Sequence, residues 1–110
     1  MHDVRALISQ ARDLASISPT EFARALEVDL RELERSAGVE HGTARWFPQS
    51  AAIQGYMRAS LLVIDVMIGV VQDSSTAVFH FKHLPLEDFE YKTPQMVVSE
   101  GRVVDMLLRL

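Results

Sequence analysis

Apolar residues recur every three or four positions at the start of the chain, which is the spacing of an amphipathic helix. The first such segment is predicted at residues 4–15. Two shorter helices are predicted at Pro19–Leu26 and Leu30–Ala37. Each follows a residue that can cap a helix, Ser18 or Asp29, with a glutamate three positions later, and this pairing is typical of a helix start.

A loop is predicted at residues 38–49, because this segment contains two glycines and a proline. A long helix follows at about residues 50–71. It is apolar almost all round, as expected of a central core helix. Its most apolar run, residues 61–71, is shorter than the roughly 20 residues that span a bilayer, so we expect no membrane segment. A short helix capped by Ser74 or Ser75 is predicted next, ending before Pro85.

The end of the chain is predicted to form two more helices. Thr93 and Pro94 have the cap-plus-proline signature of a helix start, and Gly101 ends that helix. The last helix, residues 102–110, is more apolar than a chain this short can bury, so we expect the surplus to contact a second copy or a partner. No strand is predicted. The fold class is therefore all-α, with a helix-turn-helix-like region at residues 1–45 and a small helical domain at residues 46–110.

The composition excludes several classes of function. The chain has 110 residues, a net charge of -4 and no cysteine. The acidic balance argues against strong non-specific binding to nucleic acid, which depends on neutralising phosphates. Without cysteine the chain can form no disulfide, thiolate metal site or cysteine nucleophile, which fits a cytoplasmic protein. We also expect no signal peptide, because charged residues interrupt the apolar positions at the N-terminus.

The two short N-terminal helices have the spacing of a helix-turn-helix. In that interpretation the second helix enters a major groove, and Arg31, Arg35, Thr43 and Arg45 contact DNA. Two glutamates on the same helix weaken the interpretation, because carboxylates are repelled by phosphates. The alternative is a purely structural hairpin.

Other candidate groups favour structural roles. Trp46 and Phe47 are expected to pack their loop onto the core, because large aromatic side chains dominate core burial. His80 and His83 lack the further ligands that a metal site needs, so no metal is expected. No phosphate loop or nucleophile elbow is present, so we expect no enzyme activity and no cofactor. Asp65 is interpreted as a satisfied core group or a polar interface residue.

The segment Phe89-Glu-Tyr-Lys-Thr-Pro94 is the most distinctive in the chain, together with Val97-Val98 and Gly101-Arg102. It resembles the antitoxins of the Xre/MbcA/ParS family, which have a Phe-Gly-Tyr-Lys-Thr block, a short helix, Gly-Arg and a final apolar helix. Arg45-Trp-Phe-Pro-Gln-Ser50 and Tyr56-Met-Arg58 are similar to the residues that lead into the family's long helix. Glu90 stands where that family commonly has glycine.

The resemblance implies an antitoxin of a type II toxin–antitoxin system. Its partner would be a RES-domain toxin, which consumes NAD or uses it for ADP-ribosylation, and its N-terminal half would repress the operon. The antitoxin would block the toxin's active site through its C-terminal domain. A separate hypothesis, which the resemblance does not imply, is that the Leu110 carboxylate reaches a cationic NAD-binding pocket. The residues expected at this contact are Phe89, Lys92, Thr93, Pro94, Gly101, Arg102, Met106, Arg109 and Leu110.

Two alternatives to this interpretation stay open. The chain could act alone as a helix-turn-helix transcriptional regulator, or it could be a helical dimeric adaptor. A homodimer is also expected, with the long helix at residues 50–71 as its seam.

Overall fold

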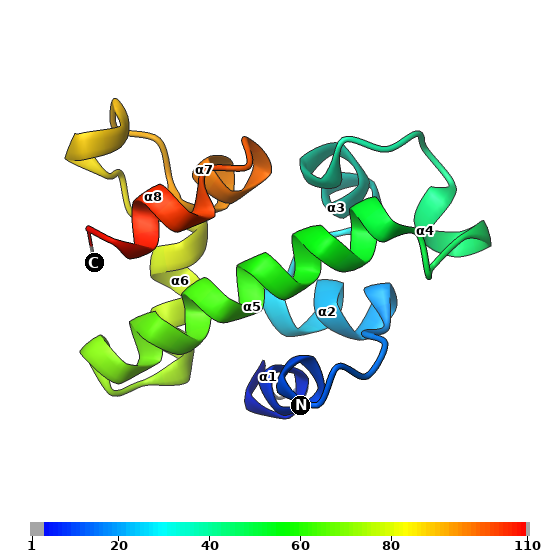
Figure 1. Cartoon of the computed structure of the whole chain (residues 1–110), viewed down its shortest axis with the longest axis horizontal. Helices are drawn as coiled ribbons and strands as arrows, with labels where there is room; N and C mark the ends of the chain where they lie inside the picture. Colours follow the sequence, from blue (N-terminus) through cyan, green and yellow to red (C-terminus); the bar gives the residue numbers. More distant parts are fainter. Residues whose placement is uncertain (1–3, 110) are drawn as a thin grey trace.

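The computed structural model describes residues 4–109, and within them the chain forms helices and no strand (Figure 1). The prediction of an all-α fold is confirmed. The helices are α1 (Val4–Arg12), α2 (Pro19–Leu26), α3 (Leu30–Ala37), α4 (Thr43–Trp46), α5 (Ala51–Val71), α6 (Ser74–His83), the 3-10 turn η1 (Glu87–Phe89), α7 (Pro94–Ser99) and α8 (Val103–Leu107).

Helix α5 forms the centre of the molecule. Figure 1 shows it crossing the middle of the fold, with α1 and α2 on one side and α3, α7 and α8 on the other. Its residues Ile53, Met57, Val63 and Ile64 are completely buried. The hydrophobic core around them combines side chains from residues 1–45 with others from residues 46–110. The two predicted regions therefore share one core.

The prediction that the long apolar helix is too short to span a membrane was wrong. Helix α5 has 21 residues and is long and apolar enough to cross a membrane by those two criteria. The apolar run at 61–71 is only its second half, because the helix begins at Ala51. Half of its most apolar window is buried within the fold, which agrees with a central core helix.

The predicted caps of the N-terminal hairpin are confirmed. The backbone N–H of Glu21 donates to Ser18 Oγ over 3.2 Å, and that of Glu32 donates to Asp29 Oδ1 over 2.7 Å. These bonds satisfy N–H groups that a helix start leaves without an intrahelical partner. Helix α3 ends at Gly38, whose φ of +73° is one that glycine adopts freely.

Helix boundaries elsewhere differ from the prediction. The first helix ends at Arg12, because the backbone is left-handed at Leu14 (φ +59°). The loop at 38–49 contains α4. Helix α6 is capped by Asp73, not by Ser74 or Ser75: Asp73 Oδ2 accepts from Thr76 N and Oγ1, and these bonds lower the pKa of the Asp73 carboxyl. The last helix covers only five residues.

Candidate interaction site

The loop between α6 and α7 forms a closed turn around Phe89. Leu86 N donates to Lys92 O over 2.9 Å, and Tyr91 N donates back to Leu86 O over 2.8 Å. Glu90 and Tyr91 both have a left-handed backbone, with φ of +60° and +63°. Within this turn the Phe89 side chain is 2% exposed, so it is part of the core.

Replacing Glu90 with glycine is expected to stabilise the fold. A left-handed backbone costs an L-residue about 1 kcal/mol, because the β-carbon approaches the following carbonyl. Glycine has no β-carbon, so Glu90→Gly should raise the free energy of unfolding by about 0.5–1 kcal/mol in urea denaturation. Glu90→Ala keeps the β-carbon and should change little. A destabilised glycine variant would contradict this account of the turn.

Two arginines lie against the Phe89 ring. The guanidinium carbon of Arg102 is 4.8 Å from the ring centroid and that of Arg109 is 5.7 Å away, which are cation–π distances. Phe89 was expected to contact a partner, but its ring is buried within the chain. Its place in the structure is that of an anchor, which positions Arg102 and Arg109 at the surface.

Lys92, Arg102 and Arg109 take part in a continuous set of ion pairs with carboxylates of the same chain. The pairs are Lys92–Glu100 (2.6 Å), Arg102–Glu100 (3.6 Å), Arg102–Asp105 (3.6 Å), Arg109–Asp105 (3.3 Å) and Arg109–Asp88 (3.7 Å). The hydrogen bond from Lys92 is the main cause that holds the pKa of Glu100 below its usual range. A partner that binds these three cations through its own carboxylates would therefore have to displace the carboxylates of this chain. That exchange should cost little free energy, because exposed ion pairs contribute little stability.

Three further predicted contact residues shape the backbone. Thr93 Oγ1 accepts from Met96 N over 3.3 Å and caps α7, as the sequence predicted. Pro94 occupies the first turn of α7 and is buried. Gly101 has a φ of +77° and reverses the chain between α7 and α8. These residues place α7 and α8, and their own side chains offer little surface.

Helix α8 carries the apolar surplus that the sequence predicted. Val104 is 68% exposed and Leu108 is 82% exposed, whereas Met106 is fully buried. Met106 was expected at the partner contact, but in this structure it packs inside the chain. Leu110, the last residue of the predicted contact, lies outside the described residues.

The four residues predicted to contact DNA do not form one group. Arg31 and Arg45 line the same cavity, together with Trp46. Arg35 lines a different cavity, between α3 and α7. Thr43 is half-buried, and its hydroxyl donates to Glu40 O over 2.7 Å within the loop.

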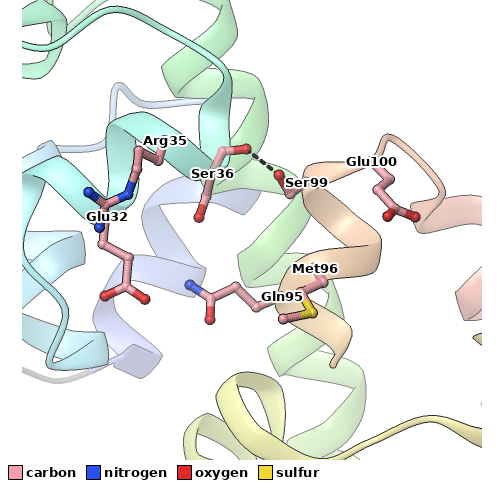
Figure 2. Close-up of a pocket in the computed structure, with 7 residues that line it drawn as sticks. All are labelled: Glu32, Arg35, Ser36, Gln95, Met96, Ser99 and Glu100. Carbon is pink, nitrogen blue, oxygen red and sulfur yellow. Dashed lines mark hydrogen bonds between the residues drawn. The ribbon is translucent and has the colours of Figure 1, made fainter. Parts of the chain in front are cut away.

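A cavity lies between α3 and α7 (Figure 2). Helix α3 belongs to the predicted region at residues 1–45 and α7 to the one at residues 46–110. Ser99 Oγ of α7 donates to Ser36 O of α3 over 2.6 Å. Figure 2 shows Gln95 extending toward the Glu32 side of α3. The cavity measures about 400 Å³ and is lined by Glu32, Arg35, Ser36, Gln95, Met96, Ser99 and Glu100.

The expectation that Trp46 and Phe47 pack onto the core was wrong. Trp46 is 73% exposed and Phe47 is 69% exposed. The neighbour that is buried is Ala44, whose N–H donates to the carboxylate of Glu34 over 2.9 Å. This bond anchors the short helix α4, from whose end the two aromatic rings face solvent.

Glu34 is a structurally important residue that the sequence interpretation missed. It is 3% exposed, and Oε2 also accepts from Gly42 N over 2.8 Å. A signal was available, because Glu34 follows Leu30 by four positions and precedes Ala37 by three. It therefore occupies a position on the apolar face of α3.

The remaining polar candidates have structural partners. Within residues 4–109, no group of three or more histidines and carboxylates could hold a metal ion. The His83 ring lies 4.8 Å from that of Phe79. Asp65 is half-buried and forms an ion pair with Arg12.

Comparisons with known proteins give no family assignment. A scan against protein-family models, a search of curated proteins and a search of solved structures each returned no match.

Proposed function

We propose that the chain is the antitoxin of a type II toxin–antitoxin system and neutralises a RES-type toxin by covering its active site. The starting point is the resemblance of residues 89–94 and of Gly101-Arg102 to the Xre/MbcA/ParS antitoxins. In this proposal residues 46–110 bind the toxin and residues 1–45 are a helix-turn-helix-like region that represses the operon. The protein acts in the cytoplasm, as a homodimer, and without catalysis.

The observation that carries the proposal is an exposed apolar pair formed by Val104 of α8 and Leu108, the residue that ends this helix. Leu108 keeps a helical backbone and its N–H donates to Val104 O over 3.1 Å, so the two side chains, four residues apart, lie on the same face. Both are mostly exposed, and Arg102 and Arg109, which form ion pairs with Asp105, flank them in the sequence. Apolar residues bordered by charged ones are the usual composition of a protein–protein contact, with an apolar centre and a polar rim.

The backbone at Glu90 also supports the resemblance. Its φ of +60° is a conformation that favours glycine, and glycine is common at this position in the Xre/MbcA/ParS antitoxins. In this proposal the loop has the same turn as in those antitoxins, and the glutamate adopts a backbone conformation that is strained for a residue with a β-carbon.

The proposal is tested by co-expression with a RES-domain toxin gene that neighbours this one. We expect the toxin alone to arrest growth, and this chain to restore growth and to co-elute with the toxin. Expression of an unrelated helical protein of similar size provides the control. Persistent growth arrest with no co-elution would contradict the proposal, as would the lack of a neighbouring RES-domain gene.

The second candidate is a transcriptional regulator that acts alone. It is favoured by Arg31, Arg35 and Arg45, none of which forms an ion pair with a carboxylate of the described residues, so all three are available to phosphates. This candidate requires DNA binding that weakens steeply with salt and falls when Arg31 and Arg35 are replaced.

A third candidate is a helical adaptor that works as a dimer. Its basis is a stripe on α5 formed by Leu62, Val66 and Val70, which are 50%, 37% and 71% exposed. These residues are four positions apart, so they share a face and are the proposed seam of a homodimer. Co-purification separates this candidate from the first, because only the antitoxin is expected to co-elute with a RES-domain toxin, whereas both are expected to form a homodimer.

A further inference from the structure

A second cavity lies beside α3 and α4, away from the C-terminal residues proposed to bind toxin. It measures about 390 Å³, which falls within the usual size of a small-molecule site. Its lining combines two arginines and a tryptophan with the buried carboxylate of Glu34. Its lining residues are Leu30, Arg31, Glu34, His41, Gly42, Arg45 and Trp46.

The wall of this cavity is held in place by Glu34. Its carboxylate accepts from the N–H groups of Gly42 and Ala44, and the ring of His41 lies 3.3 Å from Oε1. Burial disfavours the charged form, but these hydrogen bonds outweigh it and lower the pKa of Glu34 below its ordinary value. The negative charge is therefore satisfied within the loop, and the cavity is formed before any ligand arrives.

The open side of the cavity attracts anions. Arg31 and Arg45 form no ion pair with the described carboxylates, and against the single charge of Glu34 they leave the lining one unit positive when His41 is neutral. Arginine guanidinium groups match phosphate oxygens in a two-pronged geometry. An anion that bears a phosphate would thus find two suitable donors.

Trp46 adds a flat apolar surface to these cations. Its indole is 73% exposed, and the guanidinium carbon of Arg45 lies 5.6 Å from the ring centroid. Much of the ring is thus open to a stacking partner. Exposed aromatic rings beside cations are the arrangement by which proteins hold unpaired bases.

We propose that this cavity binds a nucleotide, whose base stacks on Trp46 and whose phosphate is held by Arg31 and Arg45. The nucleotide is either free or an unpaired residue of a single strand. Bases within a duplex are stacked on their neighbours and cannot reach the indole. The proposal is independent of toxin binding, since it uses none of the residues of the C-terminal segment.

Fluorescence of Trp46 tests the proposal, because this is the only tryptophan in the chain. Adenosine monophosphate should quench the emission saturably, and inorganic phosphate should compete with it without quenching. Tighter binding of a short single-stranded oligonucleotide would identify the strand as the source, and equal or weaker binding would identify the free nucleotide. The lack of saturable quenching by either, up to millimolar concentration, would overturn the proposal.

Arginine variants identify the site. Arg31→Gln or Arg45→Gln should weaken nucleotide binding about tenfold, the scale of one charge-assisted hydrogen bond. Arg35→Gln is the matched control, because Arg35 lies on α3 like Arg31 but lines the cavity between α3 and α7. An equal loss with Arg35→Gln would overturn the proposal. So would duplex binding that depends on Arg31 and Arg45 without any nucleotide quenching, and that result would support DNA binding by the helix-turn-helix-like region.

Discussion

Replacing Val104 and Leu108 with serine is expected to weaken toxin binding by about a hundredfold or more while the chain stays folded. Burying one such side chain contributes about 1.5–3 kcal/mol, and each factor of ten in affinity corresponds to about 1.4 kcal/mol. Both side chains are mostly exposed in the free chain, so their loss should cost little stability. Titration calorimetry with the purified toxin measures the affinity, and circular dichroism checks the fold.

The matched control makes the same change on another helix. Leu62 and Val70 on α5 are also exposed, at 50% and 71%, and lie far along the chain from α8. Their replacement by serine should leave toxin binding unchanged and should weaken a homodimer, if α5 is its seam. If the α5 variant lost the toxin and the α8 variant kept it, the docking surface would be on α5.

Glu34→Ala is expected to lower the free energy of unfolding by about 3 kcal/mol, because it leaves two backbone N–H groups without their acceptor. These are the buried N–H of Ala44 and the partly buried N–H of Gly42, which are ten and eight residues away in the chain. Urea denaturation measures the change. Glu32→Ala, on the same helix, is the control and should cost far less, since no N–H of a distant loop depends on it.

The stability contributed by Glu34 should also depend on pH. Its pKa is lowered in the folded chain, so its contribution is fully present above the ordinary glutamate pKa. It is lost as the pH falls through the lowered folded value. The difference in stability between wild type and Glu34→Ala should therefore shrink in acid, and a difference that grows on acidification would contradict the ionised carboxylate.

The parts of the fold that the sequence predicted correctly are those set by neighbouring residues. Ser18, Asp29 and Thr93 cap their helices as expected, because a cap depends on three or four consecutive residues. The prediction that Trp46 and Phe47 are buried was wrong because their environment depends on a distant residue. Their exposure follows from the anchoring of α4 by a carboxylate ten residues away, and no local pattern contains that contact.

The surface of the C-terminal segment was only partly predictable. Nearly every residue of the last helix is apolar, so its pattern does not say which side faces inward. The reversal at Gly101 sets the phase of α8, which buries Met106 and exposes Val104. The sequence identifies Lys92 and Arg109 as cations. Their ion pairs with Glu100 and Asp88 depend on how the loop between α6 and α7 folds, which the sequence pattern does not show.

The proposed function is tested by following NAD consumption by the purified RES-type toxin while the purified chain is added. If the chain covers the toxin's active site, consumption should stop once toxin and chain reach the stoichiometry of their complex. The Val104 and Leu108 double variant should shift this titration to much higher concentrations. Undiminished NAD consumption in the presence of a large excess of the folded chain would contradict the proposed function.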